Sequence, residues 1–215
     1  MERLFVKICG VTNLDDALCA SEAGADAIGL NFYPRSGRVI VPREAASIAK
    51  AVPAGILRVG VFVNPSREEV FSILREVKLS ALQFSGNESM EQISGFGLPI
   101  YKAIHVAHRG SIAEMESYNV EAFLLDTHKE GEFGGTGKVF DWKIGLSAKR
   151  FGKIIIAGGL TPENVSDAVK TVSPYGVDVS SGVEKSPGKK DPDKIRKFIA
   201  RAREANSQLR SSDNV

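Results

Sequence analysis

The fold class is decided late in the chain, by the stretch Ile155-Ile156-Ala157-Gly158-Gly159-Leu160-Thr161-Pro162. A β-branched run predicts a strand, the two glycines predict a turn, and a proline after a threonine predicts the start of a helix. Glycines expose backbone amide hydrogens and allow close approach, and a helix N-terminus favours an anion. The stretch therefore predicts a strand, a phosphate-binding turn and a helix that begins at Pro162.

Units of the same kind fill the rest of the chain. Short apolar or β-branched runs recur, and each is followed by apolar positions at helical spacing. We expect eight strands, at residues 4–9, 26–32, 57–63, 80–84, 100–106, 122–126, 153–157 and 176–180.

Helix starts are indicated by two signals. A serine or threonine with an acidic residue three positions later can form a capping box, and a proline fits the first helical position because its missing N–H is not needed there. Capping signals occur at Thr12, Ser66 and Ser111, proline signals at Pro42, Pro162 and Pro192, and weaker starts at Asn87 and Asp141.

The alternation of strands and helices predicts a parallel sheet, because a parallel return needs a crossover helix. An open doubly wound sheet would usually have a glycine-rich turn after its first strand, whereas here that turn is Cys9-Gly10-Val11-Thr12 and the glycine-rich turns come last. We therefore predict an α/β protein, a single-domain (β/α)8 barrel over residues 1–206, with a polar, frayed tail at 207–215.

Composition excludes several classes of protein. The 215 residues are 43% hydrophobic and 25% charged, with a net charge of +2 and no apolar stretch that could span a bilayer. Basic residues are dispersed, so nucleic acid is not an expected partner. Two cysteines are too few for a disulfide framework and no secretory signal is visible, so we expect a cytoplasmic protein. The sequence does not indicate the oligomeric state.

The functional site of such a barrel lies at the carboxyl ends of its strands. Cys9 ends the first strand, and strand alternation turns it inward together with Lys7. A lone cysteine is either a small buried hydrophobic residue or a catalytic group, and position alone does not decide. Asp178 also faces inward, on the eighth strand. Because strands one and eight meet when the barrel closes, we predict a buried ion pair between Lys7 and Asp178.

The loops after strands seven and eight predict a site for a phosphate group, because such loops bind phosphate in many barrels of this kind. Their candidate residues are Gly158, Gly159, Ser180, Ser181 and Gly182. The nearby lysines at 185, 189 and 190 are interpreted as a solvated loop, with attraction of an anionic substrate as the alternative.

Two further features concern lids and metals. The loop at 127–139 contains Gly134-Gly135-Thr136-Gly137, which is typical either of a plain surface loop or of a lid with glycine hinges. The histidines His105, His108 and His128 lack the spacing of metal ligands, so we expect no metal and no cofactor.

Several segments, taken together, resemble phosphoribosylanthranilate isomerases along nearly the whole chain. They are Val6-Lys7-Ile8-Cys9-Gly10, Gly60-Val61-Phe62-Val63-Asn64, Leu125-Asp126, Gly134-Gly135-Thr136-Gly137 with Phe140-Asp141-Trp142, Ala157-Gly158-Gly159-Leu160 with Asn164-Val165, and Val177-Asp178-Val179-Ser180-Ser181-Gly182-Val183-Glu184.

This resemblance implies an Amadori rearrangement in tryptophan biosynthesis that needs no cofactor and acts on a phosphorylated sugar. It implies that Asp126 is the general acid, that Cys9 is the general base and that Arg38 binds the anthranilate carboxylate. Cys9 would need a cation to favour its thiolate, and Lys7 is the candidate.

The chain departs from the family pattern at two positions. Gly37 stands where the family usually has proline, which would leave the loop that carries Arg38 more mobile. Ser85 stands where the family usually has histidine. This second departure keeps open a non-catalytic barrel that binds a phosphorylated metabolite. Other phosphosugar isomerases and epimerases are a further alternative, but Cys9 argues against them, since those families use a carboxylate at this position or a metal.

Overall fold

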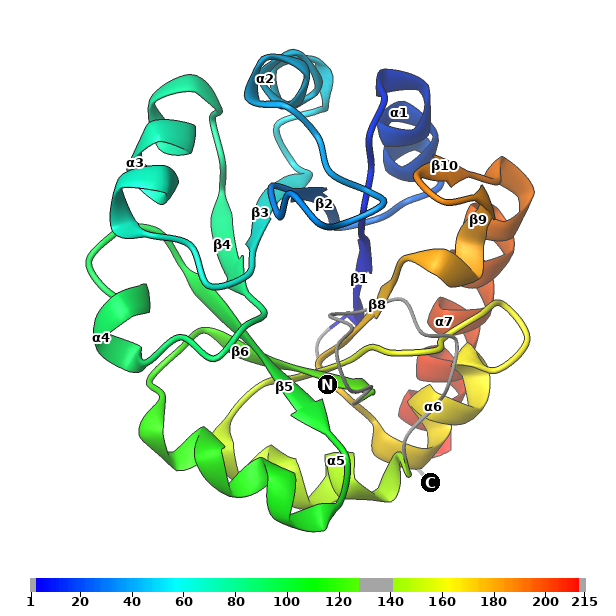
Figure 1. Cartoon of the computed structure of the whole chain (residues 1–215). Coiled ribbons are helices and arrows are strands. Elements are labelled where there is room, and N and C mark those ends of the chain that lie inside the picture. Colours follow the sequence, from blue (N-terminus) through cyan, green and yellow to red (C-terminus); the bar gives the residue numbers. More distant parts are fainter. Residues whose placement is uncertain (1–2, 128–140, 213–215) are drawn as a thin grey trace.

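Eight parallel strands close into a barrel in chain order (Figure 1). The computed structural model describes residues 3–127 and 141–212. Every predicted strand is confirmed, with ends that move by one residue at most. The strands are β1 (Phe5–Ile8), β2 (Ala27–Asn31), β3 (Leu57–Phe62), β4 (Ala81–Phe84), β5 (Ile100–Val106), β6 (Ala122–Thr127), β7 (Ile154–Ile156) and β8 (Gly176–Val179).

Helices cover the outside of this barrel (Figure 1). The α-helices of the described residues are α1 (Leu14–Glu22), α2 (Pro42–Ala51), α3 (Arg67–Glu76), α4 (Met90–Ile93), α5 (Lys143–Ala148), α6 (Val165–Val172) and α7 (Pro192–Ser212). Three 3-10 helices, η1 (Arg109–Ser117), η2 (Lys149–Phe151) and η3 (Ser181–Val183), and a short hairpin of β9 (Glu184–Ser186) and β10 (Lys189–Lys190) complete the fold.

Half of the strong helix-start predictions are confirmed. Ser66 forms a full capping box with Glu69, and α2 and α7 begin at their prolines. Thr12 does not cap α1: its hydroxyl donates to the Gly188 carbonyl at 2.6 Å, and Asn13 accepts the first-turn amide instead.

The other two strong starts are wrong. Ser111 lies inside η1, whose cap is His108. Helix α6 begins at Val165 rather than at Pro162, because the Asn164 side chain accepts from the Thr161 amide at 2.8 Å and closes a turn before the helix. The anion site expected at a helix N-terminus directly after Gly159 is therefore a loop.

The core has two parts that strand alternation separates. Outward-facing residues such as Val6 and Ile8 pack under the helices, and inward-facing residues such as Phe5 and Ala81 fill the lower barrel. Lys7 is the inward residue between Phe5 and Cys9, and it is fully buried. The apolar filling thus ends below the mouth, where polar side chains begin.

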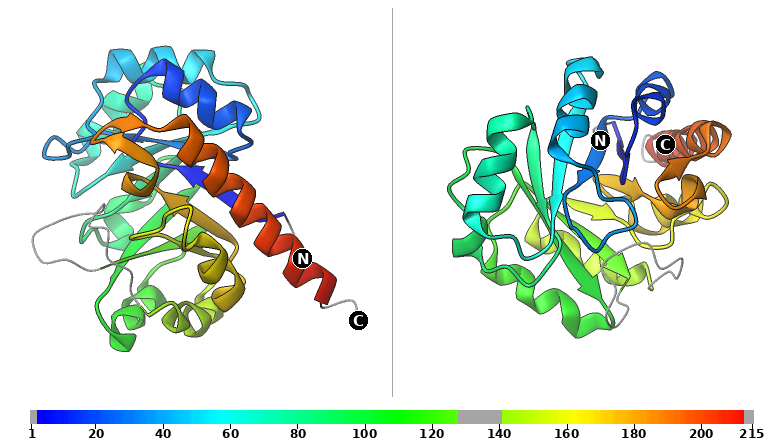
Figure 2. Two further views of the ribbon diagram at one scale, coloured as in Figure 1. Left: turned by 90° about the vertical axis from the view of Figure 1, so that its right-hand side faces the viewer. Right: turned by 45° about the horizontal axis from the view of Figure 1, so that its top comes forward.

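The predicted frayed tail is wrong over most of its length. Helix α7 continues through Ser207 to Ser212, and Figure 2 shows it running along the outside of the barrel. Its buried apolar residues keep helical spacing and extend to Ala205, with Leu209 packed against the core. Arg203 fastens it by donating to the Asp26 carboxylate at 2.6 Å. Among the described helices, none combines the length and apolarity needed to cross a membrane.

Candidate active site

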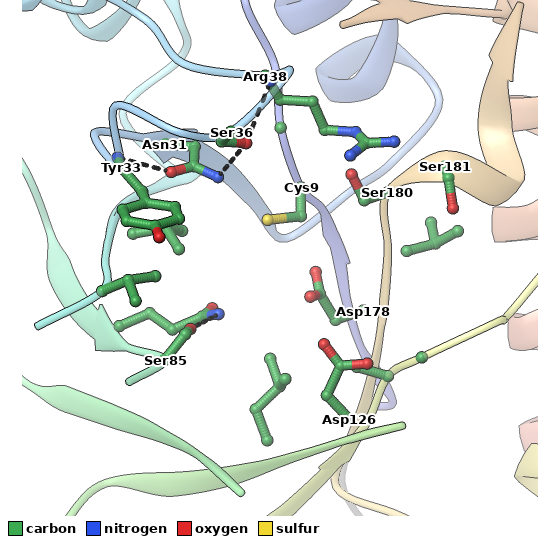
Figure 3. Close-up of a pocket in the computed structure, with 18 of the residues that line it drawn as sticks. Cys9, Asn31, Tyr33, Ser36, Arg38, Ser85, Asp126, Asp178, Ser180 and Ser181 are labelled. Carbon is green, nitrogen blue, oxygen red and sulfur yellow. Dashed lines mark hydrogen bonds between the residues drawn. The ribbon is translucent and has the colours of Figure 1, made fainter. Parts of the chain in front are cut away.

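A cavity opens at the carboxyl ends of the strands, and the sequence-predicted site residues meet there (Figure 3). Those that line it are Cys9, Arg38, Asp126, Gly158, Gly159, Ser180 and Ser181. Gly182 does not line the cavity. It lies against the neighbouring loop, where an added Cβ would overlap the Leu160 carbonyl. Glycine at 182 therefore lets the loops after β7 and β8 approach each other closely.

Lys7 and Asp178 form the predicted buried ion pair beneath the mouth. They are register partners across β1 and β8, the strands at which the barrel closes, and the Lys7 Nζ lies 2.9 Å from the Asp178 carboxylate. Burial by itself would lower the pKa of Lys7, but the charges of Asp178 and Cys9 outweigh burial and raise that pKa. Lys7 is thus a permanent cation held next to Cys9.

The surroundings of Cys9 nevertheless favour its neutral thiol. Burial raises the pKa of its thiol, and the Lys7 and Lys190 cations only partly oppose this rise, while Asp178 adds to it. The help that we expected from Lys7 is therefore present, but Asp178 opposes it and burial outweighs it.

Asp126 stands at the end of β6 and is suited to hold a proton. Burial raises the pKa of its carboxyl group to about 6, although His105 and the Thr127 amide act in the opposite direction. That amide donates to the Asp126 carboxylate at 2.7 Å, and His105 is the register partner of Asp126 on β5. A carboxyl group with this pKa is partly protonated near neutrality and can act as a general acid.

Arg38 is neither solvated nor loosely held. Its Nε and Nη2 each donate to the Glu184 carboxylate at 2.8 Å, a two-pronged ion pair that leaves only 18% of the arginine side chain exposed. The loop that carries Arg38 is also tied to β2 in spite of Gly37: the Ser36 hydroxyl oxygen accepts from the Arg38 amide and from the Asn31 side chain.

Lys190 shares the same carboxylate, which corrects the interpretation of the lysines as a solvated loop. Its Nζ lies 2.9 Å from Glu184 and its side chain is fully buried, whereas Lys185 and Lys189 are exposed. Arg38, Glu184 and Lys190 together carry one net positive charge at the mouth. Sequence reasoning did not single out Glu184, although it lies in a segment that carried the family resemblance.

The two loops after β7 and β8 offer backbone amides to a ligand. Gly158 and Gly159 have φ angles of 71° and 67°, which favour glycine. Among the described acceptors, none receives a hydrogen bond from the amides of Gly158, Gly159, Ser181 or Gly182. The Asn164 side chain donates to the Gly159 carbonyl at 3.0 Å and thereby fixes the first loop.

Several residues of the cavity lining were not selected from the sequence as site residues, among them Gln83, Ser85 and His105. Each lies within one residue of the carboxyl end of β4 or β5, so the rule that selected Cys9 and Asp126 could have found them. The glycine-containing segment proposed as a lid, together with His128, lies outside the described residues. Within residues 3–127 and 141–212, no cluster of side chains suited to a metal ion is present.

Comparison with known proteins gives one consistent answer. The family model described as N-(5'phosphoribosyl)anthranilate (PRA) isomerase matches residues 6–201. A protein of that name from Geotalea uraniireducens is 49% identical over 198 residues, which are 92% of this chain and 98% of the relative. The crystal structure of phosphoribosyl anthranilate isomerase from Thermotoga maritima is similar, with a TM-score of 0.85, 41% identity, and coverage of 93% and 98% of the two chains.

A second solved structure holds a ligand. It is a phosphoribosyl anthranilate isomerase in complex with reduced 1-(o-carboxyphenylamino)-1-deoxyribulose 5-phosphate. Its TM-score is 0.81 at 41% identity, and the match covers 93% of this chain and 98% of that one.

Proposed function

Because the chain belongs to the N-(5'-phosphoribosyl)anthranilate isomerase family, we propose that Asp126 and Cys9 are the acid and the base of that isomerisation. The chain catalyses the rearrangement of N-(5-phosphoribosyl)anthranilate to 1-(2-carboxyphenylamino)-1-deoxyribulose 5-phosphate in tryptophan biosynthesis. The observation that carries the assignment is that one mouth holds a carboxyl group with a pKa of about 6 and a thiol beside a buried cation.

The reaction moves protons and forms no bond to the protein. Asp126 gives its proton to the furanose ring oxygen as the bond between that oxygen and C1 breaks, and the nitrogen lone pair forms a protonated imine at C1. The Cys9 thiolate then removes the proton from C2, and the electron pair returns to nitrogen to give an enol. The C2 hydroxyl loses a proton while C1 gains one, which yields the ketone and an isomer of the substrate.

The reaction can begin when Asp126 and Cys9 together carry one proton. With the pKa of Asp126 near 6 and that of Cys9 raised, the resting form near neutrality holds the proton on sulfur. The reactive form has the same number of protons, with the proton on Asp126 and the negative charge beside Lys7. Transfer of that single proton as the substrate binds makes acid and base available together.

The phosphate group of the substrate is proposed to bind between the loops after β7 and β8. The amides of Gly158, Gly159, Ser181 and Gly182 support this, because they have no acceptor among the described residues. The buried Ser180 hydroxyl also lacks a partner within the described residues. In a crystal grown with sulfate, the anion should lie at Gly159 and Ser181. An anion bound only at Lys185 and Lys189 would contradict this site.

Arg38 is proposed to bind the anthranilate carboxylate. Its pairing with Glu184 occupies Nε and one hydrogen of Nη2, which leaves the Nη1 hydrogens for a ligand. The net positive charge that Arg38 shares with Glu184 and Lys190 favours a carboxylate at this side of the mouth.

The decisive experiment measures isomerisation of substrate made in situ, by the loss of anthranilate-type fluorescence. Cys9→Ser and Asp126→Asn should each lower kcat by about 10²- to 10⁴-fold, the usual contribution of a proton-transfer group, with little change in affinity for the reduced product. Cys19→Ser, on the outer helix α1, is the matched control and should keep its activity. Near-normal turnover of either first variant would show that its role is wrong.

We also propose that the enzyme is cytoplasmic, which is supported by the biosynthetic pathway to which the family belongs. The phosphorylated sugar substrate is the partner that the site itself favours.

A further inference from the structure

One buried polar atom of the mouth has no function in the chemistry above. Gln83 lies on the inward face of β4, one layer above Ala81, and only 4% of it is exposed. Its side-chain oxygen Oε1 is buried and has no hydrogen-bond partner among the described residues. A buried amide oxygen without a donor is costly, and proteins seldom retain one without a use.

The neighbouring strand β3 offers this oxygen no donor side chain. The register partner of Gln83 on β3 is Val61, whose apolar side chain lines the same cavity. The side-chain nitrogen Nε2 of Gln83 donates to the Ser85 hydroxyl oxygen at 3.0 Å. This bond fixes the amide and leaves Oε1 as an acceptor in the lining of the mouth.

Ser85 supplies the complementary group. In the described part of the chain its hydroxyl accepts the bond from Gln83 and donates none, so its hydrogen is available to an acceptor. The backbone of Ser85 is held in place, because its amide donates to the Phe62 carbonyl at 2.9 Å and its carbonyl accepts from His105 Nε2 at 2.9 Å. Figure 3 shows Ser85 across the mouth from Asp178 and Ser180.

We propose that Gln83 and Ser85 together recognise one hydroxyl group of the substrate's pentose. A hydroxyl both donates and accepts, so it can donate to Gln83 Oε1 and accept from the Ser85 hydroxyl at the same time. A carboxylate or a phosphate group would meet the Gln83 oxygen as a second acceptor. The pair therefore favours the neutral, hydroxylated part of the substrate and complements the two anion sites. This inference rests on the proposed function, since it takes the substrate from it.

The test combines one substitution with a ligand series. Gln83→Met keeps the length of the side chain and removes the acceptor, and the reduced product is compared with its three deoxy analogues, each lacking the hydroxyl at C2, C3 or C4. In the wild-type protein one analogue should bind about tenfold or more weakly than the parent. In Gln83→Met the parent should bind several-fold more weakly than in the wild type, and the loss on removing the hydroxyl should shrink to the part that Ser85 supplies.

Thermal stability separates recognition from a structural role. Gln83→Met should melt no lower than the wild type, because it removes an unsatisfied buried acceptor. Ser85→Ala should repeat the ligand result to a smaller degree, and Gln208→Met on the exposed face of α7 is the control for the same chemical change. The inference would be overturned if Gln83→Met bound the reduced product as tightly as the wild type does. It would also be overturned if removing each of the three hydroxyls weakened binding equally, in the wild type and in Gln83→Met alike. A wild-type protein that neither isomerises the substrate nor binds the reduced product would overturn the proposed function itself.

Discussion

Two buried lysine–carboxylate pairs, on opposite sides of the barrel wall, show how position changes the use of the same chemistry. Lys7 pairs with Asp178 inside the barrel, and Lys102 pairs with Glu88 outside it, each at 2.9 Å. Both pairs are almost completely shielded from water, so their Coulomb attraction and their desolvation costs are alike in kind. They differ in what else they touch.

The inner pair has a reactive neighbour, whereas the outer pair holds backbone. Lys7 interacts with Cys9 and sets the charge around its thiol. The Lys102 Nζ donates instead to the Gly86 carbonyl, and Glu88 accepts from the amides of Asn64 and Gly86. The outer pair therefore fixes the loops after β3 and β4. A buried ion pair is thus informative about function only through its further contacts.

The largest expected effect comes from breaking either pair by one substitution. Asp178→Asn and Glu88→Gln each leave a buried lysine without its counter-charge, which should lower the free energy of unfolding by about 3–5 kcal/mol. Denaturant unfolding would measure both losses. Similar losses in the two variants would confirm that both pairs stabilise the fold to the same degree. A loss below about 1 kcal/mol in either variant would contradict this prediction.

Removing both members of each pair should separate their functions. Lys102→Met with Glu88→Gln should keep most of the turnover of each folded molecule, because the glutamine can still accept from the loop amides. Lys7→Met with Asp178→Asn should lower turnover by about tenfold or more, because the thiolate of Cys9 loses its cation, and one pKa unit is worth tenfold in thiolate. Steady-state kinetics on the folded fraction would measure turnover in both double variants. Equal turnover would show that the inner pair has no more influence on catalysis than the outer pair.

The pH dependence of kcat offers a finer test. Activity should need one proton shared by Asp126 and Cys9, so the wild-type profile should rise near pH 6 and fall only above the ordinary thiol range. Asp178 raises the pKa of both groups. In Asp178→Asn both limbs should therefore move to lower pH, and Glu88→Gln should leave them in place. An upward shift of the alkaline limb would mean that Lys7 has lost its proton.

The smallest effect should come from a third pair at the mouth, Arg38 with Glu184, whose arginine is more exposed to solvent than either buried lysine. Glu184→Gln removes a charge but keeps an acceptor for the guanidinium, so KM should rise by about three- to tenfold with little change in kcat. Arg35→Gln, in the same loop, is the control. A fall in kcat without a rise in KM would place Glu184 in the chemical step rather than in orienting Arg38.

Strand alternation explains which of these contacts could be predicted from the sequence. It is a local rule, so the inward positions of Lys7 and Asp178 follow from their neighbours, and barrel closure brings them together. Arg38 lies in a loop and Glu184 begins the short strand β9, 146 residues away, and neither segment has a periodic pattern long enough to predict the direction of a side chain. The same reason explains why Lys190 was interpreted as solvated.

Helix starts show a second limit. Ser66 has its capping partner in sequence and nothing nearby competes for it. Thr12 has the same pattern, but its hydroxyl donates to the carbonyl of Gly188, which is distant in sequence. Asn13 therefore caps α1 instead. Tertiary contacts decided between adjacent capping residues, and no local pattern contains that information.

The contact between Lys7 and Asp178 also governs the order in which the protein can be made. The two residues are 171 positions apart, so a ribosome releases the first strand long before the strand that neutralises it. Until β8 is made, Lys7 lacks the Asp178 carboxylate that accepts its hydrogen bond, and an unpaired ammonium group favours water over burial. The Lys7 cation therefore becomes buried beneath Cys9 only when the barrel closes, and a chain that ends before β8 has no assembled active site.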